Sequence, residues 1–230
     1  MKKGELRKLE YLQAAEILFC RKGYESTSVQ DILDCLNASK GSFYHHFVSK
    51  ESLLEQICIR RAEQIYTSAA SAAEKESFVT AKLNTLLSGM IPLRDEKISF
   101  LLMLLPVFRL PEGRSVRECY CQALAGLFRD DLARYLEEGI NQGTVVYAAP
   151  DIDADILTVL INHLWVSICR MILSAEESGT DTDLTECLRC TERVRNVAER
   201  MLSLPYGSLD LIDLATLKSL CEQIHAHWAR

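Results

Sequence analysis

The sequence predicts an all-α protein: a small N-terminal three-helix domain followed by a larger helical domain. Gly (10) and Pro (5) are scarce over 230 residues, whereas an all-β chain of this length would need many more turn-forming residues. Apolar residues recur at helical spacing from the first turns onward. The composition, 48% hydrophobic and 25% charged, is that of a globular protein.

The first helix is predicted from residue 6 to residue 22. Its apolar residues repeat at the spacing of one helix face: Leu12, Ala15, Leu18 and Phe19. Gly23 stands where a left-handed residue ends a helix. Tyr24 is then placed to fold back onto Phe19, as in a Schellman cap.

Two short helices are predicted next. Thr27 is expected to cap the first of them, because Thr27-x-x-Gln30 has the form of a capping box. After a tight turn, Ser39 is expected to cap the second, which ends near Phe47. Helix, short helix, turn and short helix in this order is the helix-turn-helix pattern.

The rest of the chain is predicted as seven further helices. The first begins at Lys50, with Ser49 as its cap, and connects an N-terminal domain of residues 1–50 to a second domain of residues 51–230. The seven are expected at 50–73, 76–90, 94–109, 114–140, 151–176, 182–203 and 208–228. Between them lie prolines and glycines that interrupt helices.

The charge is unevenly distributed along the chain. The formal net charge is −6. Residues 1–50 hold eight Lys and Arg against six Asp and Glu, a net of +2, so the remaining 180 residues carry a net of −8. Because phosphate binding depends on Lys and Arg displacing counterions, a nucleic-acid partner is expected at the N-terminal end.

Nothing in the sequence predicts a secreted, membrane-bound or metal-dependent protein. No secretory signal is visible, and the apolar run Ile98–Phe108 is too short to span a bilayer and contains a proline. Nine cysteines without a signal suggest reduced thiols in a cytoplasm, and Cys187 and Cys190 lack a second pair at metal-site spacing. We expect a cytoplasmic protein without metal or cofactor.

The second short helix has an unusual exposed face. At roughly 100° per residue, Phe43 and Phe47 fall on one side and anchor the helix, while Gly41, Ser42 and His45 fall on the other. A glycine inside a short helix costs about 1 kcal/mol relative to alanine. The cost is understandable if a partner must approach the backbone closely, as a recognition helix in a DNA major groove requires.

Groups suited to phosphates surround this face. Lys40 and Lys50 offer point charges, and Tyr44 and Thr27 offer hydroxyls. Such contacts would fix the register of the protein on a duplex. The sequence would then be read by the residues on the exposed face.

The ordered set of features in residues 14–57 resembles the DNA-binding domain of TetR-family transcriptional regulators. The resemblance rests on Leu18-Phe19, Lys22-Gly23-Tyr24, Thr27, Ser39-Lys40-Gly41, Tyr44, His45, Phe47 and Lys50-Glu51. It implies phosphate contacts for Thr27, Tyr44, His45 and Lys50. It implies groove contacts for Lys40, Gly41 and Ser42.

The larger domain is expected to supply dimerisation, because one small helix-turn-helix buries too little surface for specific affinity. A twofold dimer would read a palindromic operator. The helices at 151–176 and 182–203 could form a four-helix interface, and the resemblance implies the same arrangement. Its candidate residues are Ile156, Leu160, Leu164, Ile168, Leu184, Leu188, Val194 and Met201.

The resemblance also implies a pocket for a small-molecule effector between the helices of residues 76–175. Candidate lining residues are Phe100, Met103, Phe108, Arg109, Tyr120, Leu124, Phe128, Asn162, His163 and Trp165. Each apolar member is equally compatible with an ordinary core position, and His163 with a hydrogen-bonded core or interface position. No paired carboxylates, nucleophile elbow or phosphate-cradling glycine loop is present, so no enzymatic activity is expected.

The hypothesis that follows is a homodimeric, sequence-specific DNA-binding regulator, a repressor released by a small molecule. Two alternatives stay open. One is a regulator of the same fold that responds to thiol oxidation through Cys119, Cys121, Cys187 or Cys190. The other is a helix-turn-helix interaction protein, or a protein that coats DNA without sequence preference.

Overall fold

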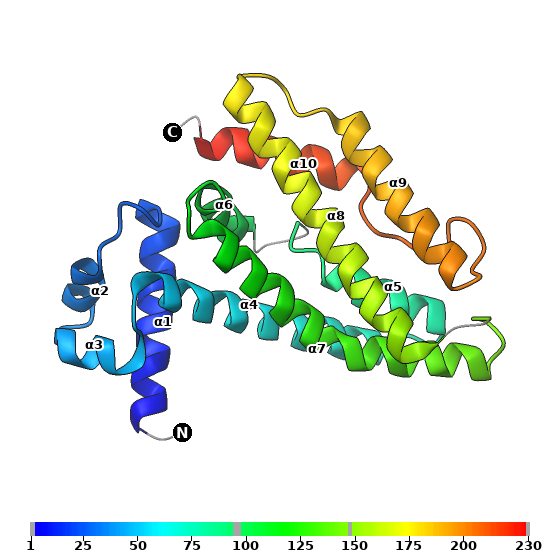
Figure 1. Cartoon of the computed structure of the whole chain (residues 1–230), viewed down its shortest axis with the longest axis horizontal. Coiled ribbons are helices and arrows are strands. Elements are labelled where there is room, and N and C mark those ends of the chain that lie inside the picture. Colours follow the sequence, from blue (N-terminus) through cyan, green and yellow to red (C-terminus); the bar gives the residue numbers. More distant parts are fainter. Residues whose placement is uncertain (1–2, 94–97, 147–148, 229–230) are drawn as a thin grey trace. The chain divides into compact units, whose positions relative to one another are not determined.

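The computed structural model describes residues 3–93, 98–146 and 149–228. Within these ranges the chain forms ten α-helices and no β-strand, which confirms the all-α prediction (Figure 1). The helices are α1 Lys3–Lys22, α2 Val29–Cys35, α3 Lys40–His46, α4 Lys50–Ala73, α5 Val79–Gly89, α6 Ile98–Val107, α7 Gly113–Asn141, α8 Pro150–Ser178, α9 Leu184–Met201 and α10 Leu214–Trp228.

Two predicted helix starts were wrong by several residues. α5 begins at Val79 and not at residue 76, and α10 begins at Leu214 and not at residue 208. The start of α10 is fixed by Asp213, whose carboxylate accepts a hydrogen bond from the Thr216 backbone N–H at 2.7 Å. Residues 94–97, where the helix at 94–109 was predicted to begin, lie outside the described residues.

The chain divides into two compact units. The first consists of Met1–Ala62 and Ser99–Ala123, and the second of Glu63–Ile98 and Leu124–Arg230. The first unit therefore extends beyond the predicted boundary at residue 50. Contacts inside it explain why: Arg61 of α4 forms an ion pair with Glu16 of α1 and lies over the ring of Phe100 of α6. These charged and aromatic contacts tie α6 to the helix-turn-helix core.

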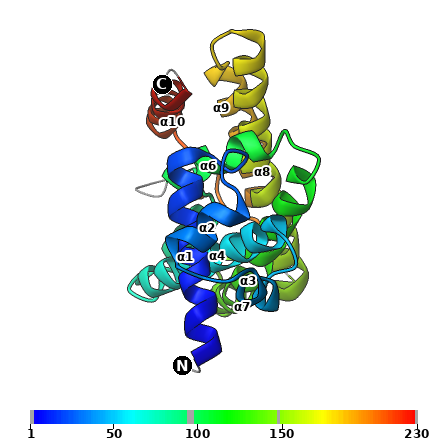
Figure 2. The ribbon, with the colours of Figure 1, turned by 90° about the vertical axis from the view of Figure 1, so that its left-hand side faces the viewer.

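Aromatic side chains fill the core of the first unit, around which α1, α2 and α3 gather (Figure 2). Tyr11, Phe43 and Phe47 are buried, and the two phenylalanines join α3 to α1 as predicted. The predicted end of α1 is confirmed as well. Gly23 has a φ of +85°, and the Tyr24 ring packs on Phe19 with 5.2 Å between ring centroids.

The second unit is built around α8, which packs against α9, while α10 packs on α9. Figure 1 shows α8 and α9 side by side and antiparallel. Among the described residues, α8 is the one helix that is long and apolar enough to cross a membrane. Half of its most apolar window is nevertheless buried inside the unit, including Trp165 and Ile168. This burial is the pattern of a core helix.

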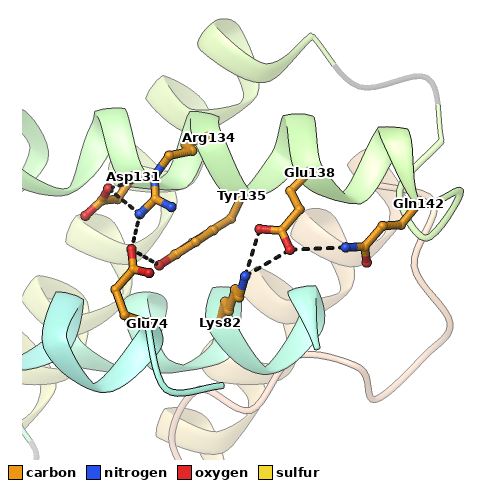
Figure 3. A network of polar contacts seen from close by, with 7 residues as sticks. All are labelled: Glu74, Lys82, Asp131, Arg134, Tyr135, Glu138 and Gln142. Atoms are coloured by element: carbon orange, nitrogen blue, oxygen red, sulfur yellow. Dashed lines mark hydrogen bonds and ion pairs between the residues drawn. The ribbon is translucent and has the colours of Figure 1, made fainter. Parts of the chain in front are cut away.

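A polar network joins the end of α4, α5 and α7 within the second unit (Figure 3). Arg134 donates to Glu74 at 2.6 Å and to Asp131 at 2.9 Å, and the Tyr135 hydroxyl donates to the same Glu74 carboxylate at 3.1 Å. Tyr66 of α4 also donates to Asp131, at 2.9 Å. The Arg134–Asp131 contact lies within α7, and the other three cross from α7 to a residue on or just after α4, so the network links these two helices.

Candidate nucleic-acid interface

α3 presents its polar residues to solvent because its two phenylalanines are buried. Ser39 caps the helix as predicted, since its hydroxyl accepts a hydrogen bond from the Ser42 N–H at 3.2 Å. Lys40, Gly41 and His45 are exposed, and Ser42 is half-buried. Tyr44 has 56% of its surface exposed, although its ring touches Phe43 edge to face. The helix therefore shows a cation, a hydroxyl and an imidazole on one accessible surface.

Gly41 lies on this surface, and no neighbouring atom of the chain requires a glycine at this position. A Cβ built on Gly41 would meet Ser39 Oγ at 4.0 Å and nothing closer. The φ of Gly41 is in the ordinary helical range, because Gly41 is not among the glycines with positive φ. The protein's own fold thus tolerates a side chain at this position.

Thr27 is placed differently from the prediction. The N-cap of α2 is Ser28, which forms the capping box with Asp31. Thr27 is fully buried, and its hydroxyl donates to the Gly23 carbonyl at 2.8 Å and to the Leu18 carbonyl at 3.4 Å. The predicted cap at Thr27 was therefore wrong, and the Thr27 hydroxyl, which was predicted to contact a phosphate, is bonded to carbonyls at the end of α1 in the free chain.

Lys50 also makes internal contacts. Its ammonium donates to the Tyr24 carbonyl at 2.9 Å and to the Thr27 carbonyl at 3.1 Å, and it lies 4.1 Å from the centroid of the Tyr24 ring. Burial lowers the pKa of Lys50 below its usual value. Ser49 caps α4 at this point as predicted, accepting from the Ser52 N–H at 3.0 Å. The inward orientation of the Lys50 side chain was not predicted from the sequence, because its partners Tyr24 and Thr27 are more than twenty positions away from it in the chain.

The adjacent histidines have different surroundings. His45 is exposed, whereas His46 is half-buried and packs on Tyr11, with 6.0 Å between ring centroids. Burial, followed by the nearby charges of His45, Lys8 and Arg7, lowers the pKa of His46. Of the two imidazoles, only that of His45 stands clear of the core.

Most other cations near α3 are already engaged. Lys22 pairs with Asp31 at 2.9 Å, and Lys8 donates to Gln56 at 2.9 Å. Hydrogen bonds from Ser28 and Lys22 hold the pKa of Asp31 well below its usual range, so this carboxylate stays ionised. Lys40 is exposed and forms no hydrogen bond or ion pair with another described residue. Lys40 is therefore available to contact a phosphate.

The predicted pocket residues are divided between the two units. In the first unit, Phe100 and Tyr120 meet edge to face with 6.1 Å between centroids. In the second, the Trp165 indole donates to Asn162 at 3.0 Å. Phe100, Met103, Tyr120, Leu124, Phe128 and Trp165 are buried, and Phe108 and Asn162 are half-buried. Arg109 and His163, which were predicted as polar contacts of the pocket, are exposed.

A cavity of about 480 Å³ lies elsewhere in the second unit, beside the start of α10. It contains none of the predicted pocket residues. Polar side chains at its wall include Asp210, Asp213 and Gln223, with Leu93 and Leu220 among the apolar ones. The described residues hold no group of His, Cys, Asp and Glu suited to a metal ion.

Three of the predicted dimer residues face the interior of their own unit. Leu164, Ile168 and Val194 are buried within the single chain, so the exposed residues of these helices are better placed to meet a second copy. α8 is apolar on several faces, and its periodicity alone did not show which face is internal. Leu160, Leu184, Leu188 and Met201 are half-buried. Ile156 is 39% exposed and lies on one face with Ile152 (62%) and Val159 (66%).

Two short helices held on a longer one, with the polar surface of the second exposed, define a helix-turn-helix DNA-binding protein. The family model described as "Bacterial regulatory proteins, tetR family" matches residues 12–57. The HTH-type transcriptional repressor KstR2 of Mycolicibacterium smegmatis is 30% identical over 176 residues, which cover 70% of this chain and 78% of that repressor. The chain belongs to the TetR family and is a DNA-binding transcriptional regulator.

Solved structures share the fold over most of the chain. A TetR-family regulator from Pectobacterium atrosepticum aligns with a TM-score of 0.60 and 16% identity, covering 89% of this chain and 100% of that one. The regulator FadR of Bacillus subtilis, in complex with stearoyl-CoA, aligns with a TM-score of 0.54 and 16% identity over 86% and 99% of the two chains. The relatives are regulators, which confirms the prediction that the protein is not an enzyme.

Proposed function

We propose that the protein is a repressor that binds a palindromic operator as a homodimer and is released by a small molecule. The observation that carries the DNA contact is Gly41. It stands exposed on α3, no contact inside the chain requires a glycine there, and alanine would favour the helix by about 1 kcal/mol. Close approach of a DNA backbone or base edge gives the missing reason.

In this proposal α3 lies in the major groove. Lys40, Gly41 and Ser42 approach the base edges, and Tyr44 and His45 approach the backbone phosphates. The exposure of Lys40, Tyr44 and His45 supports these assignments. Because the proposed partner is DNA, the proposal also includes a cytoplasmic location.

The exposed apolar face of α8 supports the homodimer. Ile152, Ile156 and Val159 lie one turn apart along α8 and are exposed in the single chain. Burial of this apolar row against a second copy of the chain is favourable, because a twofold contact places the same apolar residues on both sides of the interface. A twofold dimer would place two copies of α3 on successive turns of the duplex, which is the geometry that a palindrome demands.

A small-molecule effector is the third part of the proposal. FadR of Bacillus subtilis, which shares the fold, was solved with stearoyl-CoA. In this chain the helix α6 is almost entirely buried and apolar, from Phe100 to Val107 with only Pro106 half-buried. An effector acts by binding one conformation better than the other, with a coupling free energy of about 1–3 kcal/mol.

The four cysteines named as candidates for a thiol signal are in surroundings that argue against that role. Burial raises the pKa of Cys121 to about 11 and that of Cys187 to about 12, and it also raises the pKa values of Cys119 and Cys190. The reactive species is the thiolate, which is scarce at neutral pH when the pKa is raised. These four thiols should therefore react slowly with mild peroxide.

The test of the proposed function is a gel-shift assay with the purified protein and the DNA upstream of its own gene. Specific binding should survive an excess of random duplex DNA, and the bound segment should contain an inverted repeat. Equal affinity for upstream and random DNA would reject sequence-specific repression and favour a protein that coats DNA. Screening metabolites for loss of the shifted band then tests effector release.

A further inference from the structure

The α1–α2 turn is held together by hydrogen bonds among its own residues and by a contact from α4. The Thr27 N–H donates to the Tyr24 carbonyl at 3.2 Å, and the Thr27 hydroxyl donates to the Gly23 carbonyl at 2.8 Å. From α4, Lys50 reaches the carbonyls of both Tyr24 and Thr27. The turn is thus stabilised by hydrogen bonds of its own residues and, from outside, by the Lys50 ammonium. We call the two hydrogen bonds of Lys50 to the Tyr24 and Thr27 carbonyls the brace.

The donors of the Lys50 ammonium are largely used in these contacts. An ammonium has three N–H donors, and two of them are directed at carbonyl oxygens at 2.9 and 3.1 Å. The face of the Tyr24 ring, 4.1 Å away, attracts the same positive charge. A phosphate that recruited this ammonium would have to break bonds that are already satisfied.

These contacts lie directly before the start of α2. Tyr24 is buried against Phe19, so one carbonyl that Lys50 holds belongs to a residue fixed in the core. The other belongs to Thr27, directly before the N-cap Ser28. Holding both carbonyls fixes the path by which the chain leaves α1 and enters α2, and α3 follows α2 after a short turn.

We propose that Lys50 is a positioning residue and not a phosphate ligand: it braces the Tyr24–Thr27 turn so that α2 and α3 keep the orientation needed to enter the DNA groove. This inference rests on the proposed DNA contact of α3. It differs from the role that the sequence resemblance implies for Lys50. The counterions released on DNA binding are then displaced by Lys40 and not by Lys50.

Two matched substitutions separate the roles. Lys50→Met removes the ammonium and keeps the aliphatic stem, and Lys40→Met does the same to the exposed lysine of α3. A phosphate ligand contributes about 0.9 to the slope of log K against log salt for duplex DNA. We expect Lys40→Met to lower this slope by about that amount with an unchanged Tm. We expect Lys50→Met to weaken binding with an unchanged slope and a Tm lowered by about 3 °C or more.

Opposite results for Lys50→Met overturn the proposal. A slope lowered by about 0.9 with an unchanged Tm would identify Lys50 as a phosphate ligand. Unchanged affinity together with an unchanged Tm would show that the brace has no effect on the fold or on DNA binding.

A measurement on the unsubstituted protein decides the question even if Lys50→Met does not fold. Trace acetylation of lysines with acetic anhydride, read by mass spectrometry, reports how free each amine is. In the free protein Lys50 should react several-fold more slowly than Lys40 in spite of its lowered pKa, because its nitrogen is enclosed by the Tyr24 and Thr27 carbonyls and the Tyr24 ring. Adding the upstream duplex should protect Lys40 and leave Lys50 unchanged. Fast acetylation of Lys50 that DNA suppresses would refute the brace.

The two proposals fail in different ways. If the protein shows no sequence preference in the gel shift, the proposed repressor function fails, while slow acetylation of Lys50 in the free protein still supports the brace. If the gel shift succeeds and Lys50 behaves as Lys40 does, only the positioning role fails.

Discussion

The ring of Tyr11 on α1 meets the ring of Phe43 on α3 edge to face, with 5.6 Å between their centroids and 87° between their planes. Phe47 meets Tyr11 in the same manner at 6.0 Å. All three rings are almost fully buried. The position of the candidate recognition helix is therefore set by aromatic contacts with α1, and the polar residues of α3 remain free for a partner.

The first prediction concerns this anchor. Phe43→Leu should destabilise the first unit by about 1–3 kcal/mol, because it removes ring contacts and leaves unfilled volume in a buried site. Hydrogen exchange of peptides from α1 and α3 measures the loss locally. Tyr11→Phe keeps both ring contacts and should change exchange far less. Equal exchange in Phe43→Leu and the unsubstituted protein would show that the aromatic anchor is dispensable.

Gly41 gives a prediction in which stability and function change in opposite directions. Gly41→Ala should stabilise α3 by about 0.5–1 kcal/mol, because alanine is the better helix former and meets no atom closer than 4.0 Å. The same methyl group should weaken operator binding if DNA approaches the backbone there. Thermal unfolding and gel shifts on one preparation measure both effects. Unchanged DNA affinity would remove the main support for the proposed contact.

The surroundings of His46 lead us to predict that the folded protein loses stability in mild acid. Burial and neighbouring cations lower its folded-state pKa below the ordinary value of 6.5. The unfolded chain then takes up the proton first, so stability is fully present above about pH 6.5 and is lost as the pH falls through the folded pKa. Thermal unfolding between about pH 7.5 and about pH 5.5 should show a steeper fall than in His46→Gln. Parallel curves for the two proteins would contradict this assignment.

The local part of the helix-turn-helix was predictable from the sequence because its signals are short-ranged. Gly23, Ser39 and Ser49 act on residues within a few positions of themselves, and each has the predicted role. The α2 cap was misplaced by one residue because two overlapping patterns compete. Thr27 with Gln30 and Ser28 with Asp31 both have capping-box spacing, and a carboxylate accepts the backbone N–H of the cap more strongly than an amide.

The long-range part of the site was not predictable in the same way. The contact between Lys50 and the carbonyl of Tyr24 joins positions 26 apart, and no periodicity encodes it. On α8, apolar residues occur on several faces, so the pattern could not separate buried Leu164 from exposed Val159. Tertiary packing, which includes the contact between α8 and α9, decides which face is internal.

The exposed face of α8 leads to a prediction on assembly. Val159→Glu should dissociate the proposed homodimer while leaving the monomer folded, because the side chain is 66% exposed in the single chain and would carry a charge into an apolar contact. Sedimentation velocity measures the oligomeric state, and circular dichroism measures the fold. Leu214→Glu, at an exposed position of α10, is the control and should remain dimeric. A dimeric Val159→Glu would place the interface elsewhere.

The partly buried Lys82 makes the sharpest stability prediction for the second unit. Its ammonium donates to both carboxylate oxygens of Glu138, at 2.9 and 2.8 Å, and the two side chains are only 15% and 31% exposed (Figure 3). Lys82→Met leaves that carboxylate without its cation and should cost about 1–3 kcal/mol. Exposed Lys75→Met should stay within about 0.5 kcal/mol. Both tryptophans belong to the second unit, so their fluorescence during urea unfolding at one protein concentration reports the difference, and equal midpoints for the two variants would contradict it.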